Sequence, residues 1–262
     1  MLARDRLGDI VAVPAAARSR MTPRFFIPAP LATGRDIALP PGAAHHAAQV
    51  LRLKAGDAIT VFNGEGGEYG GEILSASPRA VNAAVTERRS VERESPLDVT
   101  LVQALIATER MDYVVQKAVE LGASAIAPVA TARSVTRLDG DRARRRVEHW
   151  RQVAIAACEQ CGRNRVPVVH PPEELRAWLQ QPAQSSLRLM LAPSAPEALA
   201  AIEPGRTVEI LVGPEGGLAP EEEAAGAAAG FRAVRLGSRV LRTETAGPAM
   251  LAALNALWGD WR

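Results

Sequence analysis

Two loops in the last third of the chain carry the residue types that could do chemistry. The first is GPEGG at 213–217, directly after the apolar run 208–212. Glycines let a backbone approach a ligand closely. Pro220 and the acids 221–223 suit the start of a helix, and acids there disfavour a bound phosphate. The loop therefore predicts a site that holds a neutral or cationic ligand through backbone groups, although a plain strand–helix turn explains the same residues.

The second loop contains RTET at 242–245. It separates an expected strand at 232–236 from an expected helix at 244–258, and Thr243 or Thr245 can cap that helix. Arg242 and Glu244 beside a ligand loop are of the types that handle charge and protons. The alternative is that they are surface charges that pair locally. Two such loops on two strands favour a functional site.

The sequence lacks the motifs of several enzyme classes. Neither loop has a GK[ST] or GxGxxG pattern, so a nucleotide P-loop and a dinucleotide fingerprint are both missing. The four histidines have no metal-ligand spacing, and no nucleophile context surrounds them. Cys158 and Cys161 give two thiols where a structural zinc site needs four ligands. They continue the apolar stripe of a helix, so we expect buried thiols, with a redox pair as the alternative.

Arginine is concentrated in one segment. Between 133 and 165 there are nine arginines and four acids. This local excess can meet phosphate, or it can be a solvated helix face. At the end of the segment, Gly162-Arg163-Asn164-Arg165 presents two arginines at one place, which we interpret as a candidate phosphate or base contact.

The pattern of elements changes near residue 95. Before it, short apolar runs predict strands at 25–27, 58–62, 71–74 and 80–85, with one helix at 45–53 and turns at Asn63-Gly64 and Gly66-Gly67. A small β-barrel at 21–92 accounts for this pattern. The polar, proline-containing stretch 90–98 predicts a linker.

From residue 98 onward, strands and helices alternate. Expected strands lie at 98–106, 124–129, 166–169, 187–192, 207–212 and 232–236. Expected helices lie at 109–121, 141–160, 172–180, 195–202, 219–229 and 244–258. Such alternation is typical of a parallel sheet with helices on both faces, and ligands bind beyond the carboxyl ends of its strands.

Composition gives broad limits. The formal net charge is +2, so global charge does not indicate nucleic acid. No apolar run is long enough for a membrane span, and the start lacks the apolar core of a signal peptide. Two cysteines favour a reducing compartment, so we expect a cytoplasmic protein. Met21 looks like a second start, so residues 1–20 are expected to be a disordered extension or a start-site artefact.

Three motifs, taken together, resemble one known family. They are IAACEQCGRNRVP at 155–167, LVGPEGGL at 211–218 and LGSRVLRTET at 236–245, supported by the stretch 111–128. They resemble the RsmE family, the bacterial small-subunit ribosomal RNA uracil-N3 methyltransferases of the SPOUT class. The match runs from about Arg24 to Asp260.

The resemblance implies a fold and a cofactor. The fold is a PUA-like RNA-binding barrel at 21–92 followed by a SPOUT α/β domain with a deep trefoil knot at 93–262, in a homodimer. The cofactor is S-adenosylmethionine, held by three loops. Carried over by position, the cofactor-binding residues are Leu191, Ala192, Pro193, Gly213, Pro214, Glu215, Gly216, Gly217, Leu236, Gly237, Val240, Leu241 and Thr245. Ser194 and Ala195 follow Pro193, where the family often has an arginine, so the resemblance does not carry over a catalytic arginine to the loop around 191–193.

The implied reaction moves a methyl group to uracil N3 of 16S ribosomal RNA, within an assembled or nearly assembled subunit and without a metal. The reaction needs N3 to be aligned with the methyl group. Because N3–H is weakly acidic, it also needs a proton acceptor and stabilisation of the charge on the uracil oxygens. Glu244 is the candidate acceptor, and Arg242 is the candidate to hold the oxygens or a phosphate. The candidate RNA-binding residues are Arg24, Arg52, Arg110, Lys117, Arg163 and Arg165.

Two other functions fit the residues less well. An α/β oxidoreductase that binds a nucleotide would need a fingerprint that the chain lacks. A non-catalytic RNA-binding module would use the barrel alone and leave both C-terminal loops without a role.

Overall fold

The computed structural model describes residues 22–136 and 139–261, so the extension expected at 1–20 lies outside the described chain. None of the helices in these two ranges has the length and hydropathy that a membrane crossing requires.

The N-terminal part forms a five-stranded sheet in the order β1-β3-β4-β5-β2, parallel only between β1 and β3. The strands are Arg24–Phe26 (β1), Asp36–Ala38 (β2), Ala58–Phe62 (β3), Glu68–Ala76 (β4) and Val81–Arg89 (β5). Four of them were predicted. Strand β2 was missed because it has three residues, none of them fully buried, and so leaves no alternating apolar pattern.

The helix predicted at 45–53 starts earlier and has two parts. The α-helix α1 (Pro41–His45) begins with a proline, which suits a first helical position because that residue needs no N–H donor. The π-helical turn η2 (His46–Val50) continues it. The helix ends before Arg52, whose positive φ of 55° is unusual for a side chain other than glycine. Both parts cover an apolar core that includes Phe25, Val61 and Ile73.

The C-terminal part forms a parallel sheet of seven strands in the order β12-β10-β11-β6-β7-β8, with β9 also paired to β7. The strands are Asp98–Ala104 (β6), Ala125–Ala130 (β7), Val168–Val169 (β8), Glu173–Glu174 (β9), Leu187–Leu191 (β10), Thr207–Val212 (β11) and Arg232–Val234 (β12). The central strands β6 and β11 are buried along most of their length, which explains why most of their residues are apolar. The predicted parallel α/β architecture is confirmed.

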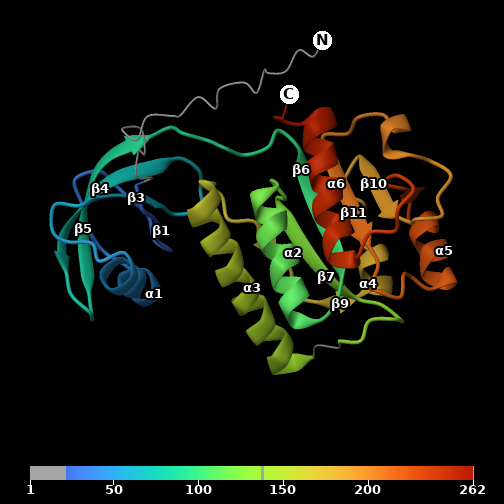
Figure 1. The fold of residues 1–262 in the computed structure, drawn as a ribbon, viewed down its shortest axis with the longest axis horizontal. Coiled ribbons are helices and arrows are strands. Elements are labelled where there is room, and N and C mark those ends of the chain that lie inside the picture. The colour runs from blue at the N-terminus through green and yellow to red at the C-terminus, as the bar shows by residue number, and fades with distance from the viewer. Residues whose placement is uncertain (1–21, 137–138, 262) are drawn as a thin grey trace, which may run out of the picture.

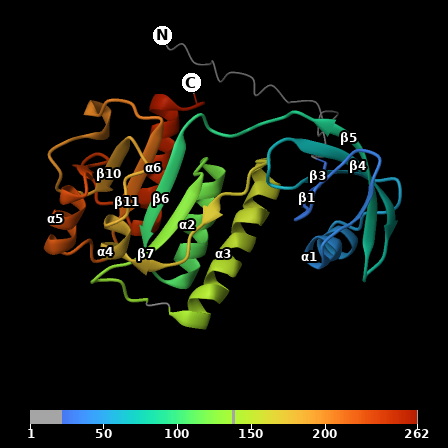
Figure 2. The same ribbon diagram turned by 180° about the vertical axis from the view of Figure 1, so that it is seen from behind.

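Helices cover both faces of this sheet. On one face, α2 (Thr108–Glu120), α3 (Gly140–Cys161) and α6 (Thr243–Trp258) share a core with residues such as Leu101 and Ile210. On the other face lie α4 (Leu175–Leu179) and α5 (Pro220–Ala228). Figure 1 shows α2, α3 and α6 starting at the same end of the sheet, and Figure 2 shows β6 and β7 in front of α2.

Two predicted helices are shorter than expected. The segment 195–202 holds only a 3-10 turn at Leu199–Ala201, because Ala198 has an extended backbone that pairs with Arg235. The segment 172–180 starts as β9 and becomes helical only at Leu175.

A buried polar network joins the two sheets. Arg24 on β1 donates to the Glu68 carboxylate at 2.6 Å and to Asn164 Oδ1 at 2.6 Å, and its side chain is 8% exposed. Arg163, at the end of α3, donates to Glu94 in the linker and to the carbonyls of Val119 and Ala123. The network therefore ties the N-terminal sheet, the linker and α3 together, while the barrel and its boundary at residue 92 stay predictions.

Glu159 on α3 adds a contact to β1, since its carboxylate accepts the Phe26 N–H at 2.9 Å. Burial raises the pKa of Glu159, and the bond from Phe26 only partly offsets this. A raised folded-state pKa means that the ionised group weakens stability as pH rises.

We expect Glu159→Gln to melt at the same or a higher temperature at pH 7, because the amide keeps an oxygen acceptor without the charge. The difference in melting temperature between Glu159→Gln and wild type should vanish as pH falls below the ordinary carboxyl pKa of 4.5. Thermal unfolding of both proteins from pH 4 to 8 checks this, and a gain that grows toward low pH contradicts it.

Candidate functional site

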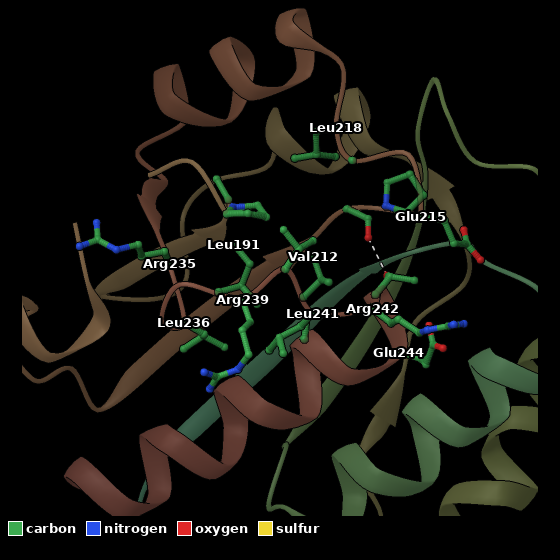
Figure 3. Close-up of a pocket in the computed structure, with 18 of the residues that line it drawn as sticks. Leu191, Val212, Glu215, Leu218, Arg235, Leu236, Arg239, Leu241, Arg242 and Glu244 are labelled. Atoms are coloured by element: carbon green, nitrogen blue, oxygen red, sulfur yellow. Dashed lines mark hydrogen bonds between the residues drawn. The ribbon is translucent and has the colours of Figure 1, made fainter. Parts of the chain in front are cut away.

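Three loops meet beyond the carboxyl ends of β10, β11 and β12 and enclose a cavity of about 400 Å³. Figure 3 shows side chains from these loops converging on it. The lining residues are Arg110, Leu191, Ala192, Pro193, Val212, Gly213, Pro214, Glu215, Gly217, Leu218, Glu223, Val234, Arg235, Leu236, Gly237, Arg239, Val240, Leu241, Arg242, Thr243, Glu244 and Ala246.

The glycine loop after β11 depends on its glycines. The Gly217 N–H donates to the Pro214 carbonyl at 2.9 Å, and Gly217 has a φ of 70°, which side chains rarely adopt. A Cβ on Gly213 would lie 3.1 Å from the Leu218 nitrogen. The loop can therefore fold back on itself and leave its backbone open to the cavity.

Thr243, the first residue of α6, holds the glycine loop in place through its hydroxyl group. Its hydroxyl donates to the Gly213 carbonyl at 2.7 Å and accepts from Gln103 Nε2 at 3.0 Å. Gln103 is fully buried at the end of β6. Gln103 was not predicted as a site residue, although a glutamine near the carboxyl end of a mostly buried strand is a signal for one.

A second fastening comes from the segment after β7. Arg133 donates to the carbonyls of Gly216 and Leu218 at 2.7 and 3.1 Å. The carboxylate of Glu222 accepts the N–H groups of Ala132 and Ala219 at 2.7 and 2.8 Å. Both ends of the glycine loop are thus held by side chains that the sequence analysis did not single out.

Charged groups gather on one side of the cavity. Figure 3 shows Arg242, Glu244 and Glu215 on this side and Arg235 on the opposite side. Arg110 donates to Glu215 at 2.9 Å. Within the described chain, the exposed Arg242 has no side-chain partner, and the buried Oε2 of Glu244 accepts no hydrogen bond. An acid and an arginine are therefore both available at the rim for a bound molecule.

The cavity brings together most of the predicted cofactor residues. Eleven of the thirteen line it, which leaves Gly216 and Thr245 outside the lining. Gly216 faces Arg133, and Thr245 is exposed on the first turn of α6. Whether the eleven bind the cofactor stays a prediction.

The predicted RNA-binding residues do not form one surface. Arg110 lies at the cavity, Lys117 pairs with Glu120 on α2, and Arg52 is exposed on the barrel. Arg165 is exposed and pairs with Glu92 at 3.1 Å.

The prediction that Arg24 and Arg163 bind RNA needs correction. Both side chains are at most 8% exposed and are held in the network between the sheets. A buried arginine cannot meet a phosphate of a bound RNA, so neither residue is an RNA contact. In the sequence, the two arginines of the GRNR motif look like free surface charges, because the acids that they pair with lie about 70 residues earlier in the chain.

The buried-thiol interpretation is confirmed for Cys158, while Cys161 is half-buried. Cys158 is fully buried, and burial raises its pKa to about 12. Burial likewise raises the pKa of Cys161. Since the thiolate is the reactive form, neither position favours redox chemistry. No group of three or more potential metal-ligating side chains occurs in the described residues.

The chain can now be compared with known proteins. A family model described as an RNA methyltransferase domain matches residues 93–255, and one described as an RNA methyltransferase PUA domain matches residues 39–86. The ribosomal RNA small subunit methyltransferase E of Mycobacterium bovis is 36% identical over 82% of this chain and 84% of its own length. The chain belongs to the RsmE family of RNA methyltransferases.

Solved structures of RsmE relatives agree with this assignment. The enzyme of Neisseria gonorrhoeae, bound to S-adenosylmethionine, is 37% identical, covers 92% of this chain and all of its own, and superposes with a TM-score of 0.86. A Legionella pneumophila protein described as a methyltransferase, also with this cofactor bound, is 36% identical over 91% of this chain and 99% of its own, with a TM-score of 0.87. The resemblance to the RsmE family is therefore confirmed.

Proposed function

We propose that this RsmE family member transfers a methyl group from S-adenosylmethionine to N3 of a specific uridine in small-subunit ribosomal RNA. The observation that carries the proposal is the cavity at the carboxyl ends of β10, β11 and β12, in a chain whose relatives have this cofactor bound.

The cavity suits this cofactor. Its glycine loop offers backbone groups and has no basic side chain of its own, while Glu221, Glu222 and Glu223 begin α5. Acids at a helix start repel phosphates but tolerate a sulfonium cation. Apolar side chains such as Leu191, Leu236 and Leu241 can enclose an adenine ring. When bound, the cofactor supplies an electrophilic methyl group on sulfur.

The protein side chains supply the remaining requirements. Glu244 is suited to take the N3 proton, because its buried Oε2 has no hydrogen bond in the described chain. Arg242 is suited to hold the uracil oxygens, since its planar fork matches two acceptors and the negative charge that develops on them. Thr243, between them, keeps both in register with the glycine loop through Gly213.

The wider arrangement extends the proposal. We propose that the barrel at 21–92 binds RNA while 93–262 carries the reaction, in a homodimer in the bacterial cytoplasm. We also propose that the chain after β12 forms a deep trefoil knot. In support, Arg235 pairs with Ala198 in a parallel bridge and donates to Ala195 O at 2.7 Å, so the segments that follow β12 and β10 run side by side.

The deciding experiment uses S-adenosylmethionine labelled on its methyl group, with intact small subunits and naked ribosomal RNA as substrates. Label at N3 of one uridine supports the proposal, and label on another atom overturns the assigned position. No label on either substrate favours a non-catalytic RNA-binding module. Calorimetric titration with NADH in parallel tests the oxidoreductase alternative.

The fastening of the glycine loop leads to a prediction. We expect Arg133→Ala to weaken S-adenosylmethionine binding about 10-fold, because two charge-assisted hydrogen bonds to the loop are lost at an exposed site. Arg133→Lys should recover part of the affinity with one of the bonds. Calorimetry measures both, and Arg144→Ala, which removes an exposed arginine on α3, is the control. Unchanged affinity in Arg133→Ala would mean that the loop holds its shape alone.

A further inference from the structure

The first three turns of α3 carry a stripe of cationic side chains that the proposed chemistry does not use. Arg142, Arg145, Arg146 and His149 follow the spacing of one helix face. Arg142 and Arg145 are exposed, and neither has an ion pair within the part of the chain that the structure describes. Arg144, on a different side of the helix, pairs with Asp141 at 3.1 Å. We call Arg142, Arg145 and Arg146 the α3 stripe.

Helix stability does not explain this stripe. The amino-terminal end of a helix carries partial positive charge, so cations there are unfavourable by a few tenths of a kcal/mol each. Arg142 lies in the first turn of α3, and Arg145 and Arg146 lie in the second. The fold gains neither a buried contact nor an ion pair from Arg142 and Arg145 within the described residues. A binding partner with negative charge accounts for them.

The stripe leads to the cavity. Arg146 donates to Thr108 Oγ1 at 2.9 Å, and His149 bonds to Asp112 at 2.8 Å, so this face of α3 lies against the start of α2. Two residues after Thr108, Arg110 lines the cavity and reaches Glu215. Figure 1 shows α2, α3 and α6 beginning at one end of the sheet. This is the carboxyl end of the strands, beyond which the cavity lies, because each of these helices follows a strand of the parallel sheet. This face of α3 therefore lies beside the start of α2, which reaches the cavity at Arg110.

We propose that the α3 stripe binds the phosphate backbone of the RNA substrate and guides the strand to the cavity mouth at Arg110 and Arg242. This inference rests on the proposed function, because RNA is the polyanion that an RsmE family member must hold near its cavity. Arg142 and Arg145, which have no internal partner in the described chain, can neutralise phosphates and release counterions, which makes binding dependent on salt. The surface reads no bases, so it contributes affinity and orientation rather than sequence choice.

The test is the double charge reversal Arg142→Glu with Arg145→Glu, assayed for binding to a small-subunit ribosomal RNA transcript at several salt concentrations. The matched control is Arg176→Glu with Arg206→Glu. It changes the net charge equally at exposed positions on α4 and just before β11, away from α3. Both variants should fold, and the α3 variant should melt no lower than wild type because acids suit the start of a helix.

We expect the α3 variant to lose at least about 10-fold in RNA affinity at low salt, with the slope of log affinity against log salt smaller by about 1 to 2 units. The control should keep the wild-type slope, and S-adenosylmethionine affinity should be unchanged in both. Equal losses in the two variants, or an unchanged slope in the α3 variant, overturn the proposal.

Because the experiment measures RNA binding rather than methyl transfer, it separates a failure of the α3 stripe proposal from a failure of the proposed reaction. A wild-type protein that transfers no methyl group, with the α3 variant still deficient in binding, overturns the proposed reaction and supports the RNA surface. Normal methylation and normal binding by the α3 variant overturn the surface and leave the reaction standing. A wild-type protein that binds no RNA overturns both.

Discussion

Arg242→Ala is expected to slow methyl transfer to ribosomal RNA about 100-fold or more, the usual loss for one group that stabilises developing charge. Affinity for S-adenosylmethionine should stay within about 3-fold, because the Arg242 side chain makes no hydrogen bond to the loops in the described chain and is exposed at the rim. Single-turnover methylation of small subunits and calorimetry with the cofactor measure the two quantities separately.

Two further variants sharpen this result. Arg242→Lys keeps the charge but loses the planar fork, so it should recover only part of the rate. Arg232→Ala removes an exposed arginine from the start of β12, outside the cavity lining, and should keep the wild-type rate. Full methylation by Arg242→Ala, with normal cofactor binding, rules out the role proposed for this residue.

The parts of the site that could be predicted are local in sequence. The glycine loop and the segment 236–245 each follow their strand directly, and a strand, a glycine-rich turn and a helix start can be recognised within about a dozen residues. The parallel sheet then requires that such loops meet at one edge. The predicted strand 207–212 and helices 109–121 and 244–258 agree with the structure to within a residue at each end.

The parts that could not be predicted depend on partners far along the chain. Gln103 meets Thr243 across 140 residues, and Arg133 meets Gly216 across 83. No periodicity links such pairs, since only the packed sheet brings them together. Arg163 misled for the same reason, because its partner Glu94 lies 69 residues earlier. The bare sequence does not distinguish an arginine that faces solvent from one that ties two domains.

The second large effect is expected at Glu68, where the two domains are tied. Its carboxylate is 4% exposed and accepts from Arg24 at 2.6 Å and from Arg93 at 2.9 Å. Glu68→Gln removes the charge that compensates the buried Arg24. Breaking a buried ion pair on one side costs about 3–5 kcal/mol, so we expect a loss of that order in the free energy of unfolding at pH 7. Glu87→Gln, which breaks an exposed pair in the same barrel, should cost at most about 1 kcal/mol.

The pH dependence of Glu68→Gln has a definite sign. Burial by itself raises the pKa of Glu68, but hydrogen bonds and charge from Arg93 and Arg24 outweigh it and lower the pKa below the ordinary 4.5. The stability from Glu68 is therefore present above pH 4.5 and is lost as pH falls through the lowered pKa. The difference between wild type and Glu68→Gln should shrink below pH 4.5, and a constant difference contradicts the assignment.

Unfolding experiments can also show whether this network makes the two domains one cooperative unit. All four tryptophans, at 150, 178, 258 and 261, lie in the C-terminal part, so their fluorescence reports the catalytic domain alone, whereas circular dichroism reports both. If the unfolding transitions seen by fluorescence and by circular dichroism coincide in wild type and separate in Glu68→Gln, the N-terminal domain unfolds first once the buried ion pair is broken. Since the barrel is proposed to hold RNA, the same variant should then lose subunit methylation at temperatures where the cofactor still binds. Transitions that still coincide in a destabilised Glu68→Gln would show that the remaining contacts, among them Arg163 with Glu94, suffice to couple the domains.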